Sequence, residues 1–134
     1  MEKDFWKWHK EKEKLNASTD IVYFDEREVW WCSLGCNIGF EQDGKNEHFE
    51  RPILVFKKFN KDILWILPMT SKTLSNKNPS AVRKYYYELV YKNEKFAVIL
   101  SQLRLISSKR LLRKIRTLSE DEFIEVRDRI ESLI

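Results

Sequence analysis

The sequence has only two cysteines and two histidines, so it is poor in the residues that build disulfide frameworks and many metal sites. It also has only three glycines. Cys32 and Cys36 are too few for a disulfide framework, and one C-x-x-x-C pair does not supply the four ligands that zinc normally takes. His9 and His48 lie far apart in the chain, and no acidic cluster suits a pair of magnesium ions. The chain also lacks a P-loop and a G-x-S-x-G motif. We therefore expect no metal and no cofactor.

Long apolar runs are missing as well, and no stretch approaches the roughly 20 residues of a membrane span. The N-terminus is charged throughout and contains no apolar segment of the signal-peptide type. We therefore expect a cytoplasmic protein with no membrane partner. With 43% hydrophobic and 34% charged residues among 134, the composition is typical of a globular domain with one hydrophobic core.

Charge is distributed unevenly along the chain. The net charge is +4, yet residues 1–50 carry 7 basic against 12 acidic side chains, and residues 119–134 carry 2 against 6. Residues 51–118 carry 16 against 3. A basic block of this size attracts a polyanion, because lysine and arginine contacts to phosphates release condensed counterions. On charge alone, an ordinary solvated surface remains the alternative.

The chain opens with a predicted helix over residues 3–15, in which Phe5, Trp8 and Leu15 recur near helical spacing. The polar segment after this helix indicates a linker. We therefore predict an N-terminal helical extension and linker over residues 1–20 and a second unit over residues 21–134. The extension could pack on this unit, extend a dimer or contact a partner, and its aromatic side chains could be core or a ligand surface.

The second unit is predicted to be mostly β. Two apolar runs on either side of the turn residues Asn60 and Asp62 indicate a hairpin, and their continuous apolar character indicates central strands. All three glycines fall in a long loop before this hairpin, and a polar loop is predicted over residues 70–81. The predicted strands cover residues 29–34, 52–56, 63–67, 85–91, 96–100, 102–106 and 111–118.

A C-terminal helix is predicted after a capping-box pattern formed by Ser119 and Glu122. Its apolar positions share one face and are Phe123, Val126, Ile130 and Leu133. Several short strands closed by one helix predict a small, strongly curved sheet or barrel. Nothing in the pattern indicates a parallel βαβ unit.

Two polar residues stand at the ends of the central strands. Arg51 precedes Pro52 at the start of one strand, and Thr70 closes the next. If the hairpin is tight, these two ends lie side by side, near the glycine-bearing loop. An arginine before a strand is commonly just solvated and threonine favours strands in general, so the pattern alone leaves their role open.

Five pieces of sequence add a resemblance to this pattern. In order they are R-E-V-W-W at 27–31, G-F-E-Q-D-G at 39–44, R-P-I-L-V at 51–55, L-P-M-T-S at 67–71 and L-S-Q-L-R-L-I-S-S-K-R-L at 100–111. With these pieces the chain resembles the MazF/PemK family of toxin–antitoxin ribonucleases, over about four-fifths of its length. The resemblance implies an SH3-like barrel with flanking helices, a homodimer, a cognate acidic antitoxin and metal-independent cleavage of single-stranded RNA at short sequences.

The resemblance also implies site residues. Arg51 and Thr70 correspond to the catalytic pair, in which the arginine grips the phosphate while the RNA 2′-hydroxyl attacks and leaves a cyclic phosphate. Arginine is a poor base because its pKa exceeds about 12, so the acid–base roles stay open, with Glu41 and His48 as candidates. The expected RNA-binding residues are Gln42, Ser71, Lys72, Arg83, Gln102 and Arg104.

Two other functions fit the same fold. One is a non-catalytic module that binds nucleic acid or protein, and the other is a gyrase-directed toxin. The tyrosines at 85–87 likewise have two interpretations, since an exposed tyrosine among basic residues can stack on a base and a buried one belongs to the core.

Overall fold

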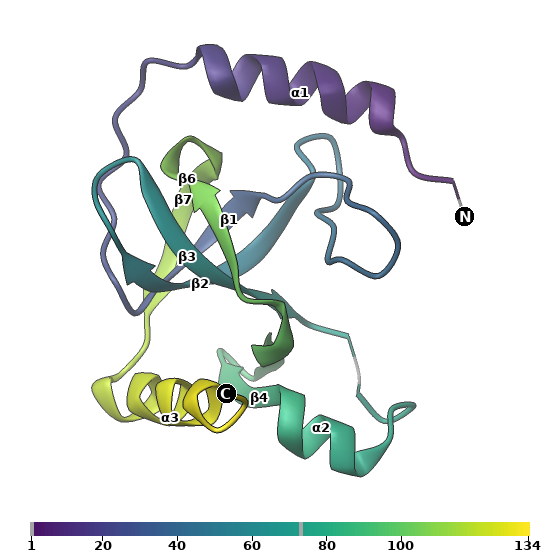
Figure 1. The fold of residues 1–134 in the computed structure, drawn as a ribbon, viewed down its shortest axis with the longest axis vertical. Coiled ribbons are helices and arrows are strands. Elements are labelled where there is room, and N and C mark those ends of the chain that lie inside the picture. Colours follow the sequence, from purple (N-terminus) through teal and green to yellow (C-terminus); the bar gives the residue numbers. More distant parts are fainter. Residues whose placement is uncertain (1, 73) are drawn as a thin grey trace.

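A curled antiparallel sheet with one helix on one side and two helices on the other makes up the fold in a computed structural model (Figure 1). The structure describes residues 2–72 and 74–134. The elements are α1 (Phe5–Ala17), β1 (Glu28–Ser33), β2 (Glu50–Lys58), β3 (Ile63–Thr70), α2 (Pro79–Tyr85), β4 (Tyr86–Tyr91), β5 (Glu94–Ile99), η1 (Leu100–Gln102), β6 (Arg104–Ser107), η2 (Ser108–Arg110), β7 (Leu111–Thr117) and α3 (Glu120–Glu131). None of the helices in these described ranges combines the length and the apolar character needed to cross a membrane.

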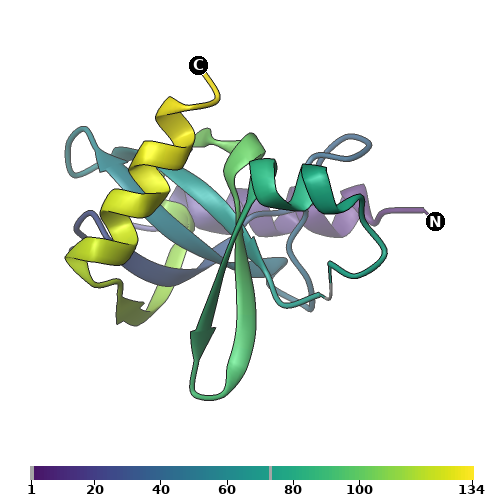
Figure 2. The ribbon, with the colours of Figure 1, turned by 90° about the horizontal axis from the view of Figure 1, so that it is seen from below.

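The sheet has two parts that share β3. Its strand order is β4-β5-β3-β2-β1-β7, and β6 also pairs with β3. Leu64 in the first half of β3 pairs with β6, whereas Met69 and Thr70 at its end pair with β5. We call β7-β1-β2-β3-β6 the barrel and the β4–β5 hairpin the wing. The wing projects away from the barrel in Figure 2.

The central strands β2 and β3 are buried on both faces in the stretches 53–55 and 66–69, whereas Ile63 and Trp65 at the start of β3 are exposed. Ile53 and Ile66 pack inside the barrel, whereas Leu54 and Leu67 belong to a second core on the opposite face, together with Val126 of α3. Side chains alternate between the faces of a strand, so burial on both faces requires a continuous apolar run. The prediction of a central hairpin is confirmed, and Asn60 accepts hydrogen bonds in its turn from two backbone amides.

Helix α3 covers the second core through the predicted face. Val126 and Ile130 are buried, and Phe123 packs against the same cluster. The capping box forms in both directions, because Ser119 Oγ accepts from the Glu122 amide at 3.1 Å and Glu122 Oε1 accepts from the Ser119 amide at 3.1 Å. The predicted C-terminal helix is confirmed.

Residues 79–85 form α2, which the sequence analysis did not predict. The Asn78 side chain accepts from the Ser80 amide at 2.8 Å, and Pro79 takes the first helical position, where its missing N–H costs nothing. The predictions of a loop through residue 81 and of a strand from residue 85 were therefore wrong at this point. Another predicted strand start, at Gln102, lies instead in the short helix η1.

Helix α1 packs against one end of the barrel with part of the predicted face. Trp8 is its one buried residue and Leu15 is half-buried, whereas Phe5, predicted on the same face, is 51% exposed. The Trp8 ring lies 5.4 Å from that of Phe49. Of the three roles open for the extension, packing on the barrel is the one observed.

Candidate active site

The loop between β1 and β2 folds back on itself through two glycines. Gly35 has a φ of +87°, and a Cβ there would come within 2.3 Å of the Trp8 ring. At Gly44 a Cβ would lie 1.4 Å from the Phe49 carbonyl oxygen. The Gly44 amide donates to the Gly35 carbonyl at 2.8 Å, so the two glycines let the loop close at its base.

Side chains hold the rest of this loop in place. Asp43 Oδ1 accepts from the Asn37 amide at 2.6 Å, and the Asn37 side chain donates to the Gln42 carbonyl at 2.8 Å. From the other side, Gln102 Oε1 accepts from the Gln42 amide at 2.7 Å and Gln102 Nε2 donates to the Phe40 carbonyl at 3.2 Å. Gln102, an expected RNA contact, thus supports the backbone that carries Gln42.

Arg51 is enclosed by this loop and is only 5% exposed. Its Nε donates to the Asp43 carbonyl, and its Nη1 donates to the Met69 carbonyl at 3.1 Å. With the Gln42 amide turned so that its oxygen faces the guanidinium, that oxygen accepts from Nη2 at 2.8 Å. Burial lowers the pKa of Arg51, and the Asp43 charge opposes this shift. Of the five N–H groups of a guanidinium, two therefore have no acceptor among residues 2–72 and 74–134.

Thr70 ends β3 beside this guanidinium. The β2–β3 register pairs Ile53 with Pro68, and its continuation brings Thr70 opposite Arg51. Thr70 is 7% exposed, and its Oγ1 accepts from the Lys72 amide at 3.2 Å, which leaves the hydroxyl hydrogen available to donate. The predicted proximity of the two strand ends is confirmed, while their chemical roles remain predictions.

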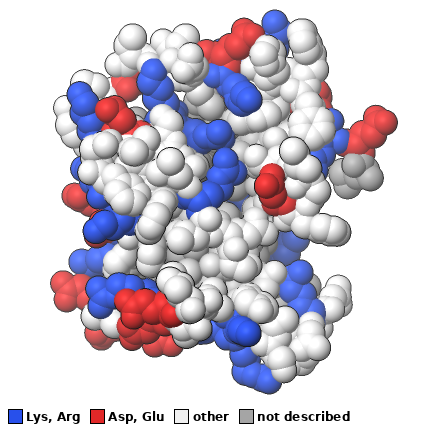
Figure 3. All heavy atoms as spheres, in the orientation of Figure 1, with Lys and Arg blue, Asp and Glu red and all other residues white. Residues whose placement is uncertain are grey.

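Two lysines add positive charge around Arg51. Burial lowers the pKa of Lys45, and the neighbouring charges of Lys72 and Arg51 lower it further. Lys45 reaches this position through a short hairpin, in which its backbone exchanges hydrogen bonds of 2.7 and 2.8 Å with Glu50. Figure 3 shows Lys and Arg side chains near the centre of the molecular face drawn there. Lys45 was not among the predicted site residues, and its one signal in the sequence is the G-K-N turn.

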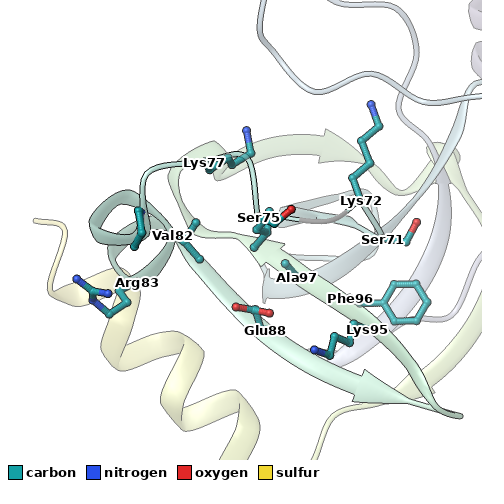
Figure 4. Close-up of a pocket in the computed structure, with 12 residues that line it drawn as sticks. Ser71, Lys72, Ser75, Lys77, Val82, Arg83, Glu88, Lys95, Phe96 and Ala97 are labelled. Carbon is teal, nitrogen blue, oxygen red and sulfur yellow. The ribbon is translucent and has the colours of Figure 1, made fainter.

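A cleft of about 490 Å³ opens next to Thr70, between α2 and the wing (Figure 4). Three of the expected RNA contacts line it together, namely Ser71, Lys72 and Arg83. The other lining residues are Leu74, Ser75, Lys77, Pro79, Val82, Glu88, Lys95, Phe96 and Ala97. The cleft offers both cations and apolar surface, which suits an anionic chain with flat bases.

Other predicted site residues have different partners. His48 Nδ1 lies 3.4 Å from Glu11 of α1, and Glu41 Oε1 accepts from the Ile38 amide at 3.1 Å. Within the described ranges, neither side chain forms a hydrogen bond or ion pair with Arg51.

Arg104 also lies away from these contacts, in β6 opposite Ile66. Its charge lowers the pKa of Arg110, although burial is the larger cause of that shift. Outside residues 1 and 73, no three His, Cys, Asp or Glu residues gather in a way that would hold a metal ion.

The chain is similar in fold to a solved structure, the crystal structure of MazF (Form-I) from Deinococcus radiodurans. The TM-score is 0.64 at 21% sequence identity, over 84% of this chain and 96% of that one. This likeness establishes the mostly β fold with flanking helices, as predicted. A comparison with curated proteins finds no significant match.

A family model identifies the chain more closely. The model described as PemK-like, MazF-like toxin of type II toxin–antitoxin system matches residues 25–134. The protein belongs to this toxin family, which confirms the resemblance drawn from the five sequence pieces. Helix α1 lies outside the matched residues.

Proposed function

We propose that the protein is a metal-independent endoribonuclease toxin that cuts single-stranded RNA at short sequences, with Arg51 and Thr70 at its centre. The observation that carries the proposal is a buried guanidinium with two uncommitted N–H groups beside a threonine hydroxyl. Membership of the MazF-like toxin family supports it.

The chemistry needs little from the protein beyond alignment and charge stabilisation. The RNA 2′-hydroxyl attacks the adjacent phosphorus, the bond to the 5′-oxygen breaks, and a 2′,3′-cyclic phosphate and a 5′-hydroxyl result. The two remaining N–H groups of Arg51 bind the non-bridging oxygens, on which negative charge grows in the transition state. Thr70 donates to the same phosphate. Because the guanidinium is already held by three acceptors, little reorganisation is required when the charge develops.

The proton transfers need a base and an acid. Glu41 and His48 remain predictions for these roles, although both side chains have partners away from Arg51. We add Lys45 as a candidate acid for the leaving 5′-oxygen, because burial and the charges of Lys72 and Arg51 lower its pKa. If Lys45 is the acid, the cleavage rate falls as the pH rises through this lowered pKa, and Lys45→Met removes that limb of the pH profile.

The proposal includes the binding partners. We propose that RNA extends from Arg51 into the cleft through Ser71, Lys72 and Arg83. Gln42, whose side chain faces Arg51, and Arg104, which lies in β6 outside the cleft, remain predicted RNA contacts. A type II toxin has a cognate antitoxin, and an acidic segment of it would cover the same basic surface by charge complementarity. We further propose a homodimer that acts in the cytoplasm. Light scattering tests the dimer against the 16.3 kDa mass of one chain.

The decisive experiment is RNA cleavage in excess chelator. A mixture of single-stranded RNAs of varied sequence should yield discrete fragments ending in 2′,3′-cyclic phosphate. Arg51→Ala should lower the cleavage rate by about 10²–10³-fold, as loss of a charge-stabilising donor does. Arg51→Lys keeps the charge but not the planar fork, so it should restore little. Lys57→Ala, on the exposed end of the same strand, is the matched control and should cleave normally.

Three outcomes separate the candidate functions. Intact RNA across all sequences would overturn the ribonuclease proposal. RNA binding that weakens with salt but yields no product would favour a non-catalytic module. Inhibition of DNA supercoiling by gyrase, with no RNA cleavage, would favour the gyrase-directed toxin.

A further inference from the structure

The segment before α1 contacts the loop that encloses Arg51. Lys3 Nζ lies 2.9 Å from Asp43 Oδ2 and donates to the carbonyls of Asn37 at 2.5 Å and Gly39 at 3.0 Å. An ammonium has three N–H donors, so all three are directed at one loop. Both charged side chains of the pair are largely shielded, with exposures of 23% and 28%, which makes this contact stronger than an ordinary surface ion pair.

Asp43 connects this contact to the guanidinium. One carboxylate oxygen meets Lys3, the other accepts from the Asn37 amide, and the backbone carbonyl accepts from Arg51 Nε. The preceding residue, Gln42, supplies the oxygen for Arg51 Nη2. Lys3 is thus two contacts away from the proposed phosphate-binding group.

Trp8 fixes the position of the segment along the loop. Its ring fills the space at Gly35 and lies 5.4 Å from the Arg110 guanidinium. Asp4 caps the first turn of α1 by accepting from the Lys7 amide at 2.9 Å. Figure 1 places this end of α1 beside the loop between β1 and β2. Because Trp8 holds this end of α1 against the loop, the segment before the helix has a fixed position, and Lys3 lies beside Asp43.

We propose that Lys3 is a positioning residue of the active site, which orients Arg51 for phosphate by holding Asp43 and the loop around it. The inference rests on the proposed function. Without Lys3, the Asp43 carboxylate loses its cation and the carbonyls of Asn37 and Gly39 lose a donor. The loop that carries the Asp43 carbonyl is then held less firmly against Arg51 Nε. Displacement of a catalytic group by about 1 Å is sufficient to slow a reaction up to 10²-fold.

Lys3→Met tests this inference, since it removes the charge and keeps an unbranched chain. We expect the cleavage rate at saturating RNA to fall about 10-fold, with KM and the melting temperature little changed. Lys7→Met is the matched control, because Lys7 is exposed in the first turn of the adjoining helix α1 and its charge change is identical. Asp43→Asn should show a similar loss, and the double variant Lys3→Met/Asp43→Asn should be no slower than either single variant, because the two residues act through one contact.

A second measurement does not depend on cleavage. The Arg51 Nε–H group should give a protected signal in ¹⁵N NMR, because it donates to the Asp43 carbonyl. We expect Lys3→Met to speed its hydrogen exchange at least 10-fold and Lys7→Met to leave it unchanged. If the wild-type protein cuts no RNA, the proposed function fails while this measurement still decides the role of Lys3. Unchanged exchange and cleavage in Lys3→Met, or equal losses in both lysine variants, would overturn the inference.

Discussion

Helices α1 and α3 pack against the same sheet by different means. Helix α3 buries Val126 and Ile130 in a continuous apolar core, and a complete capping box begins it. Helix α1 buries Trp8 alone and is otherwise held by polar contacts to loops. The matched family region includes α3 and leaves out α1. We infer from this comparison that α3 stabilises the fold, whereas α1 and the segment before it stabilise one arrangement of the loop around Arg51.

The largest expected effect on stability is that of Val126→Ala. Val126 of α3 is fully buried, and truncating a buried aliphatic side chain leaves a cavity, so the free energy of unfolding should fall by about 3 kcal/mol. Urea denaturation measures this change, with Arg127→Ala on the exposed side of α3 as the control. Below the melting temperature the cleavage rate per folded molecule should stay normal. A slower rate would contradict the division of roles between the helices.

Trp8→Ala should slow cleavage, which Val126→Ala should not, and should lower stability less. We expect the free energy of unfolding to fall by about 2 kcal/mol. This is less than the loss for a tryptophan in the core, because α1 can detach while the sheet stays folded. Hydrogen exchange should show the amides of α1 opening first. Cleavage should fall to about the level of Lys3→Met, since the segment that holds Asp43 is released. Simultaneous unfolding of α1 and the sheet would indicate that α1 is part of the core.

Ser119→Ala tests whether a change at the start of α3 affects stability alone and leaves cleavage unchanged. It removes the side-chain oxygen that accepts from the Glu122 amide, and loss of such a cap costs about 1 kcal/mol. Thermal unfolding should begin earlier while cleavage at low temperature is unchanged. Ser119→Thr is the matched control, because its hydroxyl also caps helices.

The smallest effect is expected for Lys109→Ala. Lys109 donates to the Asn16 carbonyl at 2.8 Å, at the end of α1 that lies away from Asp43. Because the contact is exposed, we expect the free energy of unfolding to fall by less than about 0.5 kcal/mol and cleavage to stay normal. A marked loss of activity would mean that α1 acts through its whole length and not through Lys3 and Trp8.

The parts of the fold that the sequence predicted are those with local signals. The hairpin of β2 and β3 is indicated by apolar runs around Asn60, and α3 is indicated by its cap and its periodic face. Helix α2 was missed because an Asn-Pro pair begins both turns and helices, and the residues after the proline decide between the two. On α1 the burial of Trp8 agrees with the predicted face, but the exposure of Phe5 does not. The partner that Trp8 covers is a glycine, Gly35, which no apolar pattern marks.

In the candidate site too, some features were predictable from local sequence signals and others were not. The proximity of Arg51 and Thr70 was predictable, because a tight hairpin brings its strand ends together. The position of Lys45 and the Lys3–Asp43 contact were not predictable from the sequence. Both depend on a loop conformation that Gly35 and Gly44 allow, and both involve residues far apart in the chain. The same loop turns His48 toward Glu11 and away from its expected place.

The shared strand β3 has a consequence for the proposed catalytic pair, Arg51 and Thr70. Arg51 pairs with Cys32 inside the barrel, whereas Thr70 pairs with Ala97 of the wing. Between the two halves of β3 stands Pro68, which has no N–H to donate. Leu89 and Val98 of the wing are buried in the second core, so the place of the Thr70 hydroxyl depends on how the wing packs there, whereas the place of the Arg51 guanidinium depends on the barrel.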